Sequence, residues 1–231
     1  MAELPKSSAV LQVLFVAVFG AVLVALSVGN AEAGGTGFQD DFDSFESTRW
    51  TKSDHVLGRT DLDPANVSVG SGYARLKIPA RTTGGAEIAS VEPYGYGTYK
   101  ARIKTANAPS SITGFFLYRS PDYEAEIDIE IYNDGSGKVD FVTYADGRRT
   151  HVATKKLGFD PSAAFHVYRF DYKPGAVKFY VDGKLMQVWE NSLPRDSMKL
   201  LVDTWFPRWL AGTAPRLDRY TRVDWIRYRQ V

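Results

Sequence analysis

Apolar and polar side chains alternate in short segments along most of the chain after Phe38. Successive side chains of a β-strand point to opposite faces, so a period of two residues predicts strands with one buried face. The 3.6-residue period of an amphipathic helix is almost absent from the same region. Alternation is clearest at residues 73–80, 97–106, 113–120, 138–147 and 222–229. The pattern predicts an all-β fold.

Residues 166–189 predict three consecutive strands joined by two tight turns. The turn sequences are Lys173-Pro174-Gly175 and Asp182-Gly183, both of which are typical of hairpins. Neither a repeat nor a linker interrupts the chain after residue 34. About a dozen strands without repeats favour two antiparallel sheets packed as a sandwich. We therefore predict one sandwich domain.

The segment 123–134 places three carboxylates at every second position, with isoleucines between them. Glu126, Asp128 and Glu130 should therefore share one face of a strand, roughly 7 Å apart along the backbone, while the isoleucines enter a core. Two interpretations remain open. The acidic face is simply solvated, or it holds protons at different pKa values for chemistry.

Aromatic residues near the acids favour the second interpretation. Phe116 and Tyr118 share a strand face just before the acids, Tyr144 follows them, and Asp203 and Trp205 repeat the spacing of two. Aromatic rings stack on the apolar faces of sugars, so rings beside carboxylates are typical of a polysaccharide cleft. Retaining glycosidases need two carboxyls about 5 Å apart, so a curved strand must bring the two glutamates together.

Composition limits the other function classes. The chain has 231 residues, 44% of them hydrophobic, a net charge of +1 and no cysteine. The charge gives no basic field for nucleic acid and no polybasic patch for an anionic membrane. Without cysteine, disulfides cannot form. His55, His151 and His166 are scattered and form no recognisable zinc motif. We expect a monomer that binds polysaccharide and no nucleic acid.

The N-terminal segment resembles an export signal. Lys6 precedes an apolar run over residues 9–28, and Ala31-Glu32-Ala33 offers a cleavage site of small residues. We predict a signal peptide at residues 1–33 and a catalytic domain at 34–231, secreted to the extracellular space or periplasm without stable membrane insertion. The alternative is an uncleaved anchor, because about 20 apolar residues can also span a bilayer.

Four segments together resemble glycoside hydrolase family 16. They are "EIDIE" at 126–130, "YGYGTYKARIK" at 94–104, "GFDPSAAFHVYRFDYKPGAVKFYVDG" at 158–183 and "VDWIRY" at 223–228. The resemblance is closest to bacterial lichenases, which are endo-β-1,3-1,4-glucanases, and it extends from Phe38 to Arg229. It implies a concanavalin-like β-jelly roll with a concave substrate cleft.

The resemblance also implies roles for particular residues. Glu126 corresponds to the nucleophile, Glu130 to the general acid/base and Asp128 to the helper carboxylate. The residues that correspond to the substrate cleft are Glu87, Phe116, Tyr118, Tyr144, Asp203 and Trp205. Catalysis would need no cofactor, but a structural calcium ion is implied on the convex side, held by Asp224 and a backbone carbonyl at Gly72.

Four positions depart from the family pattern. Ala89 stands where an arginine is common, Glu124 where a tryptophan is common, and Val142 and Asp203 where asparagines are common. We therefore predict a retaining endo-β-glucanase for β-1,3-1,4- or β-1,3-linked glucan, with the reaction better determined than the substrate. The alternatives are a transglycosylase, a hydrolase of another β-glycan such as xyloglucan or galactan, and a non-catalytic carbohydrate-binding jelly roll.

Overall fold

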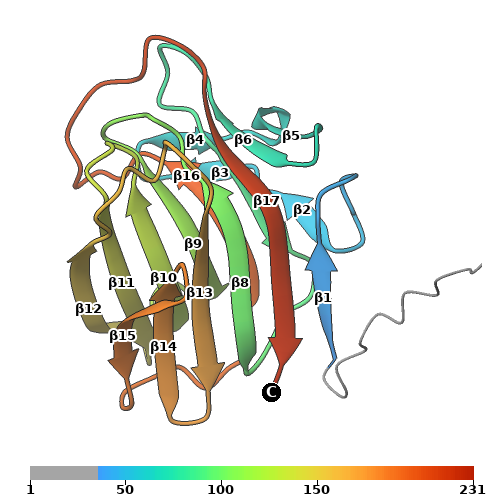
Figure 1. The fold of residues 1–231 in the computed structure, drawn as a ribbon, viewed down its shortest axis with the longest axis vertical. Coiled ribbons are helices and arrows are strands. Elements are labelled where there is room, and N and C mark those ends of the chain that lie inside the picture. Colours follow the sequence, from blue (N-terminus) through green and yellow to red (C-terminus); the bar gives the residue numbers. More distant parts are fainter. Residues whose placement is uncertain (1–35) are drawn as a thin grey trace, which may run out of the picture. The chain divides into compact units, whose positions relative to one another are not determined.

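The computed structural model describes residues 36–231, so the predicted signal peptide at 1–33 lies outside the described residues. Over residues 36–231 the chain forms two large β-sheets that pack face to face (Figure 1). Within this range no helix is long and apolar enough to span a membrane. The all-β sandwich prediction is confirmed.

The first sheet has eight strands in the order β15-β14-β13-β8-β17-β6-β5, with β1 paired to β17. Its strands are β1 (Gly37–Asp40), β5 (Val67–Val69), β6 (Ala74–Ile78), β8 (Gly97–Lys104), β13 (His166–Lys173), β14 (Ala176–Val181), β15 (Lys184–Trp189) and β17 (Arg219–Gln230). Neighbouring strands of this sheet pair antiparallel.

The second sheet has seven strands in the order β12-β11-β10-β9-β16-β7-β2, again with antiparallel pairing. Its strands are β2 (Trp50–Lys52), β7 (Ala86–Ser90), β9 (Ile112–Arg119), β10 (Ala125–Tyr132), β11 (Lys138–Ala145), β12 (Arg148–Lys156) and β16 (Lys199–Trp205). A separate hairpin of β3 (His55–Leu57) and β4 (Thr60–Leu62) precedes a short 3-10 helix, η1 (Pro64–Asn66).

The predicted strands match observed ones, but several observed strands were not predicted. The three strands expected within 166–189 are β13, β14 and β15, and Gly175 and Gly183 in their turns adopt positive φ. The strands β1 to β5 have only three or four residues, which is too short for alternation to be visible. All five residues of β7 are buried, so this strand has no exposed face to produce an alternation of polar and apolar residues.

The core lies between the two sheets. Ile127, Ile129 and Ile131 of β10 are fully buried and form part of it, as their alternation with the acids predicts. Aromatic contacts join the sheets, with ring centroids 5.1 Å apart for Phe115 and Phe170. Because the isoleucines face inward, the acids of β10 lie on the outer face of the second sheet.

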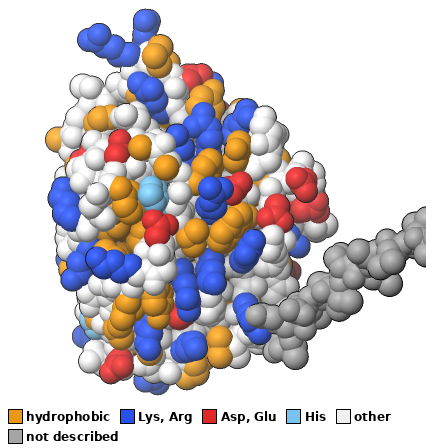
Figure 2. All heavy atoms as spheres, in the orientation of Figure 1, with side chains coloured by type: hydrophobic (Ala, Val, Ile, Leu, Met, Phe, Trp, Pro, Cys, Tyr) orange, Lys and Arg blue, Asp and Glu red, His pale blue; other side chains and the backbone are white. Residues whose placement is uncertain are grey.

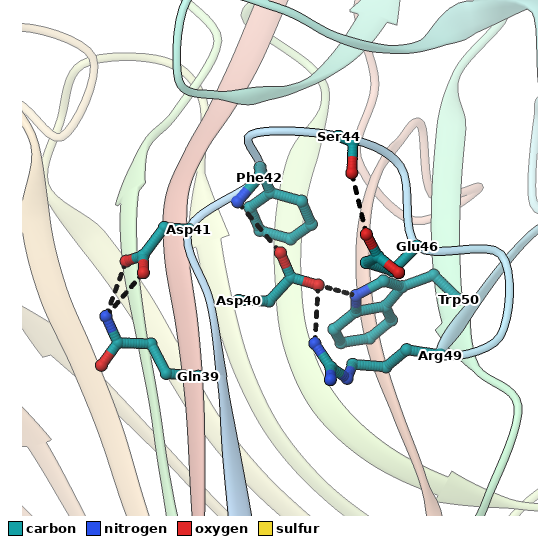
Figure 3. A network of polar contacts seen from close by, with 8 residues as sticks. All are labelled: Gln39, Asp40, Asp41, Phe42, Ser44, Glu46, Arg49 and Trp50. Atoms are coloured by element: carbon teal, nitrogen blue, oxygen red, sulfur yellow. Dashed lines mark hydrogen bonds and ion pairs between the residues drawn. The ribbon is translucent and has the colours of Figure 1, made fainter.

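A buried carboxylate fastens the N-terminal strand of the first sheet to the start of the second (Figure 3). Asp40 at the end of β1 accepts hydrogen bonds from Trp50 Nε1 at 2.8 Å and Arg49 Nη1 at 3.1 Å. Its other oxygen accepts from the Phe42 backbone N–H at 2.9 Å. The buried charge is thus paired and hydrogen-bonded, which is the condition for tolerating it in a core without disulfides.

Candidate active site

The register of β9, β10 and β11 places aromatic residues beside the acids. Glu126 lies opposite Tyr118 on β9 and Tyr144 on β11, and Asp128 lies opposite Phe116. Cross-strand neighbours on one face are close enough for their side chains to interact. The strand pairing therefore joins the acids and rings that the sequence places in separate segments.

A second cross-strand row continues from Glu130 across five strands. Glu130 pairs with Asp140 on one side and Gly114 on the other, Gly114 pairs with Asp203, and Asp203 pairs with Glu87. The Gly114 backbone N–H donates to Asp203 Oδ1 at 2.8 Å, and a Cβ at position 114 would lie only 2.7 Å from that oxygen. Only glycine leaves room for this carboxyl group.

These two rows form the floor of a cleft of about 650 Å³. All predicted catalytic and substrate-binding residues line it, namely Glu87, Phe116, Tyr118, Glu126, Asp128, Glu130, Tyr144, Asp203 and Trp205. The Trp205 ring is held against Gly58, where a Cβ would come within 2.6 Å of the ring. The side chains that the sequence predicts to share strand faces thus also line one cavity.

The sequence interpretation missed the residues that form the cleft rim. They come from the β3–β4 hairpin, the loop before β10 and the loop after β16, and they are His55, Leu57, Gly58, Asp122, Tyr123, Arg208 and Trp209. Asp122 accepts a 2.7 Å hydrogen bond from the Tyr118 hydroxyl, and the Tyr123 ring packs 5.2 Å from that of Tyr144. Loops show no periodicity, so only the adjacent aromatic residues could have signalled these contacts.

Glu126 and Asp128 form a hydrogen-bonded carboxyl pair. Burial raises the pKa of Glu126, the hydrogen bond from Asp128 opposes this shift, and the resulting pKa is about 7. Burial, together with the charges of Glu126 and Glu130, raises the pKa of Asp128 well above its usual range. The raised pKa favours the protonated form of Asp128, which donates to Glu126 and so stabilises the ionised form of Glu126.

Glu130 has an equally perturbed carboxyl group. Burial is the largest cause of its raised pKa, the charges of Asp140 and Glu126 add to the shift, and Arg149 and Lys138 oppose it, so that the pKa lies at about 7. The chemical interpretation of the acidic face predicts different pKa values for the two glutamates, but the pKa values of both lie near 7. The reason is that desolvation is the largest contribution to both pKa values and acts on the two groups alike.

Asp203 and Glu87 form a second buried acidic pair. Burial and the charge of Glu87 raise the pKa of Asp203 well above its usual range, although the Gly114 N–H lowers it. Burial also raises the pKa of Glu87, against a hydrogen bond from Ser53 and the charge of His55. In its protonated form, which the raised pKa favours, Asp203 presents one oxygen acceptor and one O–H donor, which approximates the polarity of the asparagine that the family pattern would place there.

The residues expected to bind calcium lie on the opposite sheet. Asp224 sits at a β-bulge of β17 and forms an ion pair with Arg102 of β8. Gly72 lies in the open turn between β5 and β6. Among residues 36–231, no group of three His, Cys, Asp or Glu side chains could hold a metal ion. Because Arg102 is the partner of the one carboxylate of the expected site, a calcium ion would have to displace Arg102 before these residues could hold it.

Comparison with known proteins agrees with this geometry. The family model for glycosyl hydrolases family 16 matches residues 59–227. A β-glucanase of Bacillus subtilis (strain 168) is 31% identical over 240 residues, covering 97% of this chain and 99% of the relative.

Two solved structures share the fold. The Bacillus licheniformis β-glucanase aligns with a TM-score of 0.79 at 29% identity, covering 86% of this chain and 100% of that one. A β-1,3-1,4-glucanase (lichenase) from a mouse hindgut metagenome aligns with a TM-score of 0.78 at 27% identity, covering 85% and 100%. The family model covers most of the chain, and the Bacillus subtilis relative is more than 30% identical along nearly the whole length of both chains, so the chain belongs to glycosyl hydrolases family 16.

Proposed function

We propose that this protein is a retaining endo-β-glucanase whose catalytic carboxyls are Glu126 and Glu130. One observation carries the proposal: both carboxyls lie in one aromatic-lined cleft on either side of Asp128, and both have a pKa near 7. Near neutral pH such a pair holds about one proton, so that one group is ionised while the other is protonated. A retaining glycosidase needs that state.

In the first step, Glu130 donates its proton to the glycosidic oxygen while the Glu126 carboxylate attacks the anomeric carbon. The bond to the leaving sugar breaks and a covalent glycosyl ester of Glu126 forms. In the second step, the Glu130 carboxylate removes a proton from water, whose oxygen attacks the same carbon and releases Glu126. Two inversions give net retention, and Glu130 regains its proton.

The proposed substrate is a β-glucan that contains 1,3 linkages. Phe116, Tyr118 and Trp205 offer ring faces in the cleft, and Glu87 and Asp203 offer hydrogen-bonding groups. The relatives named β-glucanase and β-1,3-1,4-glucanase support this substrate class. Ala89 and Val142 replace polar residues of the family pattern beside the cleft floor, so we expect weaker discrimination among linkages.

A substrate panel tests this proposal. Barley β-glucan, laminarin, xyloglucan and agarose are incubated with the enzyme, and reducing ends and anomeric configuration are followed over time. We expect oligosaccharides of retained configuration from the first two. Inverted products would refute the mechanism, and turnover of only xyloglucan or agarose would refute the substrate. A high ratio of elongated to hydrolysed products would indicate transglycosylation, and no turnover at all would indicate a binding module.

The rate should depend on pH as a bell centred near pH 7. Below the pKa of about 7, Glu126 becomes protonated and cannot attack; above it, Glu130 loses the proton that the leaving group needs. The two limbs belong to the coupled pair rather than to either residue. Initial rates on barley β-glucan between pH 4 and 10 check this. A rate that stays constant from pH 8 to 10 would contradict Glu130 as the acid.

Trp205→Ala should weaken substrate binding more than chemistry. Loss of one stacking ring should raise KM about tenfold and leave kcat within about threefold, provided that stacking is equal in the ground and transition states. The matched control is Trp225→Ala, on the opposite sheet, for which both constants should stay unchanged. A fall in kcat at unchanged KM would contradict the binding role of Trp205.

The structural calcium ion stays a prediction. If calcium displaces Arg102 from Asp224, excess chelator should lower the melting temperature by about 5 °C or more, because a ligand that binds only the folded state stabilises it. Asp224→Asn should abolish the chelator effect. If chelator leaves the melting temperature unchanged, the calcium prediction is wrong and Arg102 is the partner of Asp224.

Secretion is also proposed, from the sequence of residues 1–33 alone. N-terminal sequencing of the protein recovered from the culture medium should find a chain that begins near Gly34. Recovery only from membranes, with the N-terminal segment still attached, would support the alternative of an anchor.

A further inference from the structure

The outer face of the first sheet is unusually basic. This face lies on the opposite side of the sandwich from the cleft, and its side chains come from β6, β8, β13, β14 and β17 (Figure 1). Figure 2, in the same orientation, shows Lys and Arg side chains gathered over β8, β13 and β17. The net charge of +1 therefore conceals a separation of charge, with acids in the cleft and bases on the opposite face.

The strand register aligns like charges directly across the strands. One row runs Arg169–Lys100–Arg227 over β13, β8 and β17. A second row runs Lys104–Arg222–Arg75 over β8, β17 and β6. Like charges directly opposite each other in a sheet are destabilising, so two such rows call for an explanation other than stability. We name these six residues the basic face.

Internal acids neutralise only part of the basic face. Asp171 is paired with Arg169, and Asp224 is paired with Arg102, which lies between the two rows on β8. Within residues 36–231, no acidic side chain forms an ion pair with Lys100, Arg222 or Arg227. These three cations are available to an external anion.

We propose that the basic face binds an acidic polysaccharide, one that carries a carboxylate on successive sugars. Lys100 and Lys104 are four residues apart on β8, so the two rows are about 13 Å apart and neighbouring cations within a row are about 5 Å apart. A small anion cannot bridge such rows, whereas an extended polyanion can. Because the cleft lies on the other face, one molecule could hold the acidic polymer and cleave a glucan within the same matrix.

Two observations favour a glycan over the other large anions. Arg227 lies 4.3 Å from the centroid of the Trp225 ring and Arg169 lies 4.4 Å from that of Tyr180, so a guanidinium group covers one face of each ring and reduces the ring surface on which nucleic-acid bases can stack. Among residues 36–231, none of the exposed large hydrophobic side chains lies on β6, β8, β13 or β17. Those strands therefore offer no such side chain for insertion into a membrane.

The test measures binding of the full chain to polygalacturonate by affinity electrophoresis and calorimetry. The test variant is Lys100→Gln/Arg222→Gln/Arg227→Gln, and the matched control is Lys155→Gln/Lys156→Gln/Arg148→Gln on β12 of the other sheet. We expect the test variant to bind about tenfold more weakly and the control to bind as the unchanged protein does. Raising the salt from 50 to 500 mM should weaken binding, because exposed charges are screened.

Two further readouts separate loss of binding from loss of fold. Hydrolysis of neutral β-glucan by the test variant should equal that of the unchanged protein, and its melting temperature should be equal or higher because like-charge repulsion is removed. The single variant Arg227→Gln, at an exposed position, should give a smaller effect in the same direction.

Three results would overturn the proposal. They are no binding of polygalacturonate by the unchanged protein, equal binding by the test variant, and tighter binding of single-stranded DNA or of phosphatidylglycerol vesicles than of polygalacturonate. None of them bears on the proposed glucanase activity, which is measured separately on the neutral polymer.

Discussion

Glu126→Ala should lower kcat on barley β-glucan by about 10⁵-fold, because the variant lacks the group that forms the covalent intermediate. Added azide should restore cleavage of an activated β-glycoside and give the α-glycosyl azide. The small anion fits the space that the carboxylate vacates and attacks from the same side, so the product has the inverted configuration. Product configuration by NMR is the measurement.

The matched control for this variant is Glu124→Ala. Glu124 lies two residues earlier in the loop before β10 and does not line the cleft, so its loss should leave kcat unchanged. Near-normal turnover by Glu126→Ala would mean that the acids of β10 form only a wet strand face. A β-configured azide would assign the nucleophile to a different carboxylate.

Glu130→Ala should lower kcat by about 10² to 10⁴-fold on substrates with a poor leaving group and much less on an activated glycoside, which leaves without protonation. Azide should here yield the β-glycosyl azide, because Glu126 still forms the intermediate and azide replaces water in the second step. The alkaline limb of the pH profile should disappear, since that limb reports the loss of the Glu130 proton.

Glu190→Ala, at an exposed glutamate outside the cleft, controls for removal of a carboxylate in general and should retain both limbs. If Glu130→Ala slowed activated and unactivated substrates equally, Glu130 would position the substrate rather than donate a proton. If the alkaline limb persisted, another group, with Asp140 the nearest carboxyl on its strand row, would be the acid.

The three acids of β10 show how much of the site could be predicted from sequence. Their spacing of two, with isoleucines between, was enough to place them on one outward face, because alternation is a local property of any strand. The rings at Phe116 and Tyr118 followed from the same rule on β9. The strands β2 and β7 were not predicted, because β2 is too short and β7 too uniformly buried to show alternation of polar and apolar residues.

The pairing of distant strands could not be read from local pattern. Glu87 of β7, Asp203 of β16 and Glu130 of β10 fall in one row only because of the observed register. The cations of β6, β8, β13 and β17 also fall in rows only because of the register, and the net charge of the chain gives no sign of them. Register is a non-local property, fixed by which buried faces meet across the sandwich.

Alternation along the chain thus determined by itself the all-β class, the inward isoleucines and the shared face of Glu126, Asp128 and Glu130. Tertiary structure alone decided that both glutamates titrate near 7, since the shift comes mainly from burial in a folded cleft. It also decided the rim of loop residues and the opposed charges of the two outer faces. The physical reason is that periodicity depends on neighbours in sequence, whereas desolvation and cross-strand contact depend on neighbours in space.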